Sequence, residues 1–319
     1  MLHAFAPHLG GLAPLPPGEQ IARARWVDLY RPLDAQVRQV KALGIDVPTL
    51  EDMEEIEISN RLYREGDAIY MTAVLPGELP DGKPVAMPVT FILSPDRLVT
   101  VRHHAPRPFT TFPTRAERSA SGVGSPDRIF LGLMEEIVAR LADILEGVGR
   151  VLDQTGALVF DSNANARDAE LRAALLRIGG QSELMARVRL GLLSVERVLS
   201  FYTSWTEAHP DADRLRALAK SINRDVQALD VHADFLGTRL GMTVDATLGL
   251  INLQQNNTVR VLSVVAALFL PPTMIASIYG MNFDVMPELH WRYGYPMALA
   301  AMVLSALLIY LLARWKRWL

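Results

Sequence analysis

Two charge-free segments near the end of the chain decide its fold class. The segment Val261–Tyr279 reads VLSVVAALFLPPTMIASIY, and the segment Tyr293–Ala313 reads YGYPMALAAMVLSALLIYLLA. Each is about twenty residues long, which is enough for a helix to cross a hydrocarbon layer of roughly 30 Å. Buried core helices are the weaker alternative, because helices of soluble proteins usually keep a polar face. The sequence therefore predicts two membrane-spanning helices, 261–279 and 293–313.

The charged residues around these spans predict their direction. Basic residues flank the hairpin at both outer ends: Arg260, Arg314, Lys316 and Arg317. The connecting loop 280–292 has a single arginine, Arg292, beside the acids Asp284 and Glu288. The positive-inside rule then places both termini and the tail 314–319 in the cytoplasm, with the loop outside the inner (plasma) membrane. An aromatic belt is expected at the interfaces from Trp291, Tyr293, Tyr295, Trp315 and Trp318.

The chain before the membrane is predicted to be α+β. No secretory signal is expected at its start, because no Lys or Arg precedes Arg23 and no long apolar core follows. Short strands and helices punctuated by Pro and Gly predict a cytoplasmic α/β domain over 1–125, followed by its helical part over 126–209. The expected strands are 25–30, 61–64, 68–75, 85–93 and 98–101, and the expected helices are 33–43 and one capped by Thr49, then 128–160 and 166–205.

A stalk helix is predicted over 210–260, and it continues without a break into the first span. From Asp213 to Tyr279 no proline occurs before Pro271, and apolar residues recur every three or four positions. Such a helix would be roughly 100 Å long. The alternative is two helices joined near Gly237–Gly241, although each glycine weakens a helix interior by only about 1 kcal/mol.

Composition excludes several classes of function. The net charge of −3 does not favour a nucleic-acid partner. The chain has no cysteine, so thiolate metal sites and cysteine nucleophiles are excluded. Phosphate-binding glycine loops, zinc-protease motifs and nucleophile elbows are also missing from the sequence. We therefore expect no cofactor and no enzyme activity.

The loop after the first span carries the most specific motif. It reads Tyr279-Gly280-Met281-Asn282-Phe283, followed by Met286-Pro287-Glu288-Leu289. GMN alone is a weak signal, since Gly and Asn often end helices, but its place between two spans makes it informative. This arrangement closely resembles the CorA family of magnesium channels, whose hallmark is YGMNF with MPEL after it. A zinc-transporting branch of the superfamily tends to have GIN and to lack MPEL, so both motifs favour the magnesium branch.

The specific resemblance covers about the last seventy residues, and extends more loosely to 48–63. It implies a homopentamer with a cytoplasmic α/β funnel, long stalk helices and the first span of each subunit lining a pore. The transported ion would be Mg²⁺, with Co²⁺ or Ni²⁺ also admitted, and Gly280, Met281 and Asn282 would form the selectivity filter at the outer mouth. Asp284 and Glu288 would attract cations there, or are simply solvated loop acids.

Helical periodicity gives the candidate pore lining. At about 100° per residue, most polar residues of the first span fall on one stripe. The stripe consists of Asn256, Val259, Ser263, Ala266, Leu270, Thr273 and Ser277, with Leu262 at its edge. Leu262 and Leu270 are candidates for hydrophobic constrictions. The alternative is that small and hydroxylated residues only let helices pack together.

Regulatory metal sites are not identified by the sequence. In the family, acids between neighbouring cytoplasmic domains bind the ion and hold the channel shut. The candidate acids are Asp225, Asp230, Asp234, Asp245, Glu51, Asp52, Glu54 and Glu55, most of which are expected to be solvated. The pair His103-His104 is expected to be two surface histidines on a loop. Two other functions remain open, namely a proton-coupled zinc transporter of the same superfamily and a membrane-anchored sensor without a pore.

Overall fold

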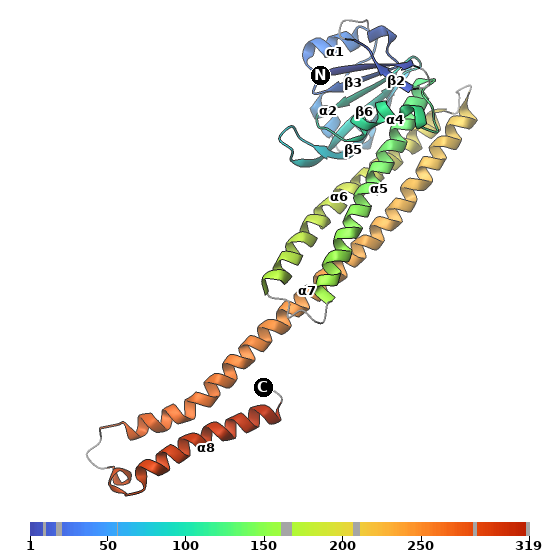
Figure 1. Ribbon diagram of the computed structural model, residues 1–319. Helices are drawn as coiled ribbons and strands as arrows, with labels where there is room; N and C mark the ends of the chain where they lie inside the picture. Colours follow the sequence, from blue (N-terminus) through green and yellow to red (C-terminus); the bar gives the residue numbers. More distant parts are fainter. Residues whose placement is uncertain are drawn as a thin grey trace. The chain divides into compact units, whose positions relative to one another are not determined.

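The computed structural model describes residues 1–8, 11–16, 21–55, 57–160, 168–206, 211–282 and 286–316 (Figure 1). By contacts the chain divides into two compact units. We call them the sheet unit, residues 1–161 and 175–243, and the hairpin unit, residues 162–174 and 244–319. The predicted division at residues 125, 209 and 260 follows composition rather than contacts and stays a prediction.

The sheet unit is built on a seven-stranded sheet in the order β2-β1-β3-β7-β6-β5-β4. Its strands are β1 (Leu2–His8), β2 (Gly11–Pro14), β3 (Trp26–Tyr30), β4 (Leu62–Glu65), β5 (Ala68–Glu78), β6 (Pro84–Leu93) and β7 (Leu98–Arg102). Neighbouring strands are antiparallel except β3 and β7, which are parallel with Trp26 opposite Leu98. Such a mixed sheet needs cover on both faces to bury its apolar residues.

One face of the sheet is covered by short helices, α1 (Asp34–Lys41) and α2 (Leu50–Glu54), which lie together in Figure 1. Val40 and Met53 pack there against Val27, Ile92 and Val99. Helix α2 begins as the sequence predicts: the Thr49 hydroxyl and the Asp52 carboxylate cap each other's backbone N–H groups. Helix α2 ends at Glu54, earlier than expected, and α3 (Ile58–Arg61) follows in the next segment.

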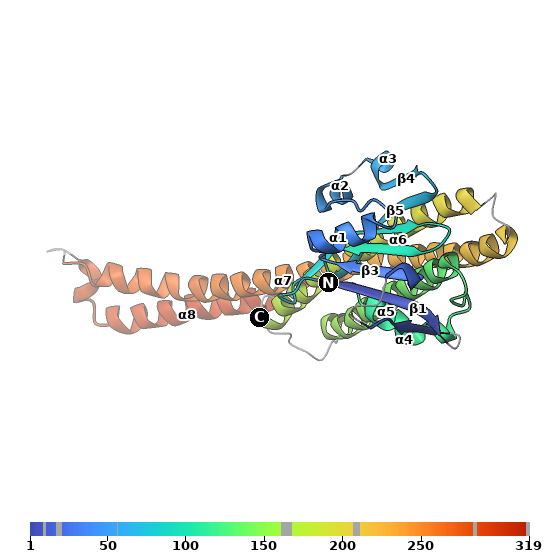
Figure 2. The same cartoon turned by 90° about the horizontal axis from the view of Figure 1, so that it is seen from above.

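The other face is covered by α4 (Pro108–Arg115) and three long helices, α5 (Pro126–Phe160), α6 (Asp168–Trp205) and α7 (Ala212–Tyr279). Figures 1 and 2 show α5, α6 and α7 running alongside one another. Their buried side chains, such as Leu145, Leu192 and Leu215, form one core with Phe91 and Trp26 of the sheet. Short 3-10 turns complete the unit at Ile21–Arg23 and Ala116–Arg118.

The hairpin unit contains the end of α7 and helix α8 (Gly294–Trp315), which lie side by side in Figures 1 and 2. A 3-10 turn, η4 (Pro287–His290), precedes α8. Both helices are long and apolar enough to cross a membrane, and little of their apolar surface is buried within the chain. That exposure excludes ordinary core helices and agrees with the two predicted spans.

Most elements agree with the sequence prediction. All five predicted strands occur within two or three residues of their predicted ends, and α7 is a single helix through Gly237 and Gly241, not two. Several short elements were not predicted: the hairpin of β1 and β2 at the start of the chain, helix α3 and the 3-10 turns. Helix α4, whose Phe109 and Phe112 pack beside Trp26, was not predicted either.

Candidate ion pathway

The predicted filter residues lie where α7 ends. Helix α7 stops at Tyr279, and its last turn is closed by the Gly280 N–H, which donates to the Ala276 carbonyl at 2.9 Å. The Met281 N–H donates to the Ile278 carbonyl at 3.3 Å. Met281 and Asn282 follow with exposed side chains. The Asn282 side chain is therefore exposed, three residues beyond the last residue of α7.

The predicted stripe follows one side of α7 for about 30 Å, taking 1.5 Å per residue from Asn256 to Ser277. Every residue assigned to it, and Leu262 at its edge, is exposed in the single chain. The hydroxyls of Ser263 and Thr273 donate to the carbonyls of Val259 and Phe269, four residues back, at 2.8 and 2.7 Å. Because each hydroxyl proton is used within the helix, the free lone pairs face outward as acceptors.

The opposite side of α7 faces α8. Between Arg260 and Tyr279 the less exposed residues are Val264, Leu268, Pro271, Pro272, Ile275 and Tyr279. At about 100° per residue, the centre of this set lies roughly 160° from the centre of the stripe. Val264 is the most enclosed, at 5% exposure. The hairpin therefore uses one side of α7 to contact α8 and leaves the polar side uncovered.

The double proline lies within this stretch, and α7 remains helical through it. Pro271 and Pro272 have no N–H group, so the carbonyls of Ala267 and Leu268 lose their usual intrahelical donors. In hydrocarbon such groups are tolerated only next to protein or a water-filled cavity. Pro271, Pro272 and Leu268 are among the less exposed residues of α7, on the side next to α8, so protein lies beside this part of the helix.

The loop residues are partly described. Asp284 lies outside the described residues, as do Arg317 and Trp318. Glu288 belongs to η4, but its side chain lies outside what the structure describes. Trp291 and Tyr293 contact each other edge to face with ring centroids 6.1 Å apart, and both are at least half exposed. Their exposure beside the start of α8 is what an interfacial anchor requires.

The candidate regulatory acids do not converge within the chain. Asp52 is engaged in the cap of α2, Glu55 accepts from Asn60, and Asp234 pairs with Arg189 of α6. Among the residues that the structure describes, no three His, Asp or Glu side chains come together as a metal site.

His104 was predicted to be a surface residue, and this prediction is wrong. His104 is fully buried after β7, where its Nε2–H donates to the Leu75 carbonyl at 2.8 Å. Burial, with a smaller contribution from the nearby charge of Arg102, lowers the pKa of His104 to about 4. Its neighbour His103 is half-buried, and burial again lowers the pKa. His103 and His104 follow the end of β7, and neighbouring residues of an extended chain point to opposite sides. The sequence alone does not show which of the two histidines points into the fold.

A buried ion pair beside His104 was also missed. The carboxylate of Asp28 in β3 accepts hydrogen bonds from Nε and Nη2 of Arg102 in the parallel strand β7, and the Nη2–Oδ2 distance is 2.8 Å. Thr100 donates to Asp28 at 2.9 Å and accepts from the Trp26 indole at 3.0 Å. The Arg102 guanidinium lies 4.5 Å from the Tyr30 ring centroid. Every member is satisfied, so the network orders the centre of the sheet instead of serving as an exposed site.

Comparison with known proteins agrees with these features. A sequence profile described as "CorA-like Mg2+ transporter protein" matches residues 22–314. The chain is 31% identical over its whole length, and the whole of the relative, to the magnesium transport protein CorA of Yersinia pseudotuberculosis. It is 31% identical to the Escherichia coli K12 protein of the same name, over 94% of each chain.

Solved structures show the same fold. The complete CorA magnesium transporter from Methanocaldococcus jannaschii superposes with a TM-score of 0.75 at 18% identity, covering 100% of this chain and 99% of the other. The full-length CmaX protein superposes with a TM-score of 0.64 at 16% identity, covering 100% and 98%. The profile match, the identity over full length and the hairpin with its GMN end lead to one conclusion: this chain belongs to the CorA-like Mg²⁺ transporter family.

Proposed function

We propose that this chain forms a homo-oligomer, a pentamer as the family resemblance implies, that conducts Mg²⁺ through the inner membrane into the cytoplasm. The observation that carries the proposal is the uncovered polar side of α7, which lies opposite the less exposed side in the hairpin. Its relatives from Yersinia pseudotuberculosis and Escherichia coli are magnesium transport proteins by name. The GMN and MPEL motifs favour magnesium over the zinc branch.

An oligomer is required because one amphipathic span cannot enclose a channel. Copies arranged about an axis with cyclic symmetry place the same stripe toward the centre in every subunit. Helix α8 then forms the outer layer, next to lipid. It is apolar along its length, with only Ser305 and Tyr310 as polar residues in its interior. The carbonyls freed by Pro271 and Pro272 lie inside the assembly, where they are tolerated.

The proposed filter is a ring of Asn282 amides. Mg²⁺ gives up its water reluctantly, so a cage of protein ligands would be slow to enter and leave. Amide oxygens can instead accept hydrogen bonds from the waters of the hydrated ion, and neutral groups bind it weakly enough to release it. Below the ring, the lone pairs of Thr273 and Ser263 face the same water, because their protons are held by the helix.

The hydrophobic positions of the stripe are proposed as the gate. Leu270 and Leu262 are 67% and 63% exposed in the single chain. Rings of leucine at a narrow point expel water and close a pore by dewetting. The inward direction needs no chemical energy, since a divalent ion gains about 4.6 kcal/mol per 100 mV of membrane potential, negative inside. Co²⁺ and Ni²⁺, with the same charge, are proposed as further permeant ions.

The test is ion uptake into liposomes that contain the purified full-length chain, under an imposed potential that is negative inside. Mg²⁺ entry should rise with the potential and should not change when a pH gradient is added. Asn282→Ala should lower the rate about tenfold or more, the effect of about 1.4 kcal/mol on the barrier, while the oligomer persists on size exclusion. The matched control is Asn257→Ala, because Asn257 is exposed on the side of α7 away from the stripe.

Other outcomes would select the rival functions. Zn²⁺ uptake that depends on a pH gradient, with little Mg²⁺ uptake, would indicate a proton-coupled zinc transporter. A chain that reconstitutes as an oligomer but passes no divalent ion would indicate a sensor without a pore. Equal flux through the Asn282→Ala and wild-type proteins would remove the amide ring from the mechanism.

A further inference from the structure

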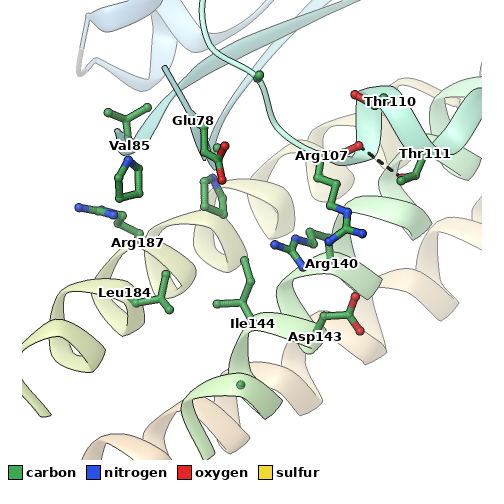
Figure 3. A pocket seen from close by; sticks show the side chains of 15 residues that line it. Glu78, Val85, Arg107, Thr110, Thr111, Arg140, Asp143, Ile144, Leu184 and Arg187 are labelled. Atoms are coloured by element: carbon green, nitrogen blue, oxygen red, sulfur yellow. Dashed lines mark hydrogen bonds between the residues drawn. The ribbon is translucent and has the colours of Figure 1, made fainter. Parts of the chain in front are cut away.

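A cavity of about 600 Å³ lies in the sheet unit, between the ends of β5 and β6 and helices α4, α5 and α6 (Figure 3). The transport pathway makes no use of it. Its lining residues come from the ends of two strands and from three helices, and it is open to solvent, with Glu78, Arg107 and Asp143 exposed. The wall at the strand end is fixed by a backbone bridge in which the Ala105 N–H donates to the Glu78 carbonyl at 2.9 Å.

Three arginines from different elements face this cavity: Arg107 before α4, Arg140 of α5 and Arg187 of α6. Figure 3 shows the side chains of Arg107 and Arg140 converging on the same corner, with Arg187 across the cavity. Arg187 pairs with Glu183, four residues earlier in its own helix. Among the described residues, neither Arg107 nor Arg140 has a carboxylate within 4 Å. Two guanidinium groups that line the same corner without a carboxylate partner favour an anion between them.

The remaining walls are of two kinds. Pro76, Val85, Ile144 and Leu184 provide an apolar surface. Glu78 and Asp143 provide carboxylates beside the arginine corner, and Glu78 points into the cavity in Figure 3. Carboxylates accept hydrogen bonds from hydroxyl groups, yet they repel a ligand that carries negative charge along its whole length. The walls therefore suit a molecule with one anionic end and an uncharged, hydroxylated body.

We infer that this cavity binds a soluble phosphomonoester about the size of a mononucleotide. The phosphate would lie between Arg107 and Arg140, because guanidinium forks match phosphate oxygens in pairs. Hydroxyls of a sugar would face Glu78 and Asp143, and a flat apolar ring would lie against Ile144 and Leu184. The volume falls within the usual range for small-molecule sites, about 300–1,000 Å³.

The site is independent of the proposed ion pathway, so its test needs no transport. The full-length chain is purified in detergent and titrated by calorimetry with AMP, adenosine, inorganic phosphate and a short-chain phosphatidylglycerol. AMP should bind about tenfold or more tightly than adenosine, since the phosphate makes the charge-assisted bonds. The double variant R107Q/R140Q should weaken AMP binding about tenfold or more, with an unchanged melting temperature.

A matched control and a second variant make the test decisive. Arg189→Gln lies two residues after Arg187 on α6, but its guanidinium pairs with Asp234 of α7 and does not line the cavity, so AMP affinity should be unchanged. Gly147→Leu keeps every charge and fills the cavity with a side chain, so it should abolish binding even if the double variant folds poorly. Equal binding of AMP and adenosine, AMP affinity retained in Gly147→Leu, or tighter binding of the phospholipid would each overturn the assignment.

Discussion

Single residues at the centre of the sheet determine how the sheet unit responds to pH. Burial raises the pKa of Asp28, but hydrogen bonds from His3, Arg102 and Thr100 together with the charge of Arg102 more than offset this, and the pKa lies below its ordinary value. A depressed carboxyl pKa stabilises the fold at neutral pH, and this contribution is lost as the pH falls through the folded value. The contribution of Asp28 is therefore lost only in solution more acidic than the ordinary pKa of its carboxyl group, 3.8.

His104 should give the protein a pH-dependent stability between about pH 6.5 and pH 4. Its pKa is lowered from 6.5 to about 4 in the fold, chiefly by burial. Above pH 6.5 the imidazole of His104 is neutral in both the folded and the unfolded chain. Between pH 6.5 and pH 4 it takes up a proton in the unfolded chain but not in the folded chain. The free energy of unfolding therefore falls with falling pH, by about 1.4 kcal/mol per pH unit at most.

The variant His104→Gln tests this. Gln keeps a donor for the Leu75 carbonyl but does not titrate, so its melting temperature should fall less than that of the wild type between pH 7 and pH 5. The measurement is thermal unfolding followed by circular dichroism in detergent. Parallel curves for the two proteins would show that His104 contributes nothing to the pH dependence.

At this scale, the role of residues at the ends of helices could be predicted from the sequence. The role of residues that depend on tertiary contacts could not. Asn282 was identified because GMN follows an apolar span directly. Asp28 and Arg102 lie 74 positions apart and meet only because β3 and β7 are parallel neighbours. His104 looks like a surface residue in sequence, since its burial depends on the close approach of Gly77.

At the scale of elements, glycines divide into those that a helix merely tolerates and those that a contact requires. A Cβ added to Gly77 of β5 would lie 2.6 Å from His104 Cδ2, 2.8 Å from the Pro106 nitrogen and 2.9 Å from the Ala105 carbonyl carbon. Two of these atoms belong to the backbone and cannot move aside cheaply. A Cβ added to Gly237 of α7 would meet nothing within 4 Å.

The same substitution should therefore have opposite effects at these two sites. Gly77→Ala should destabilise the protein by about 1–3 kcal/mol through overpacking. Gly237→Ala should stabilise it by about 0.5–1 kcal/mol, because alanine loses less backbone entropy in a helix. Thermal melts of both variants beside the wild type measure this. A Gly77→Ala protein as stable as the wild type would mean that the packing around Gly77 is looser than the contacts indicate, and a destabilised Gly237→Ala protein would contradict the open space at Gly237.

The predicted and unpredicted elements differ in the strength of their periodic signal. Helix α7 was predicted because its apolar spacing repeats over more than sixty residues and no proline interrupts it before Pro271. Strands β1 and β2 have little alternation, and Pro7 and Pro14 weaken the signal further, although Pro14 sits in an edge strand that needs fewer donors. Helix α4 begins at Pro108 and contains Pro113, a composition that is typical of a loop.

At the scale of the whole molecule, the orientation of α7 within an assembly is the property that the proposed function needs. The chain has no cysteine, so any introduced thiol is the only one present. Ser277→Cys places a thiol on the stripe, where copies of α7 would face one another. Ile275→Cys places it on the less exposed side, next to α8.

Oxidation of membranes that contain each single-cysteine variant should distinguish the two sides. Ser277→Cys should give disulfide-linked dimers of the chain on a non-reducing gel, and Ile275→Cys should give several-fold fewer. Reduction should return both to the single-chain size. Efficient crosslinking through Ile275→Cys, with none through Ser277→Cys, would place α8 at the axis and reverse the proposed arrangement.

Helix α7 is continuous from Ala212 to Tyr279, so the number of residues in it sets the direction in which each later side chain points. Adding one residue upstream of Asn256 would turn every later side chain by about 100° relative to the preceding helix, and would swing the hydroxyls toward the wrong neighbours. Adding seven residues would bring the phase back to within about 20° while extending the rod by about 10 Å. Insertions and deletions in this helix should therefore be tolerated only when they add or remove close to a whole number of helical turns. This constraint comes from the continuity of the helix and not from any single side chain.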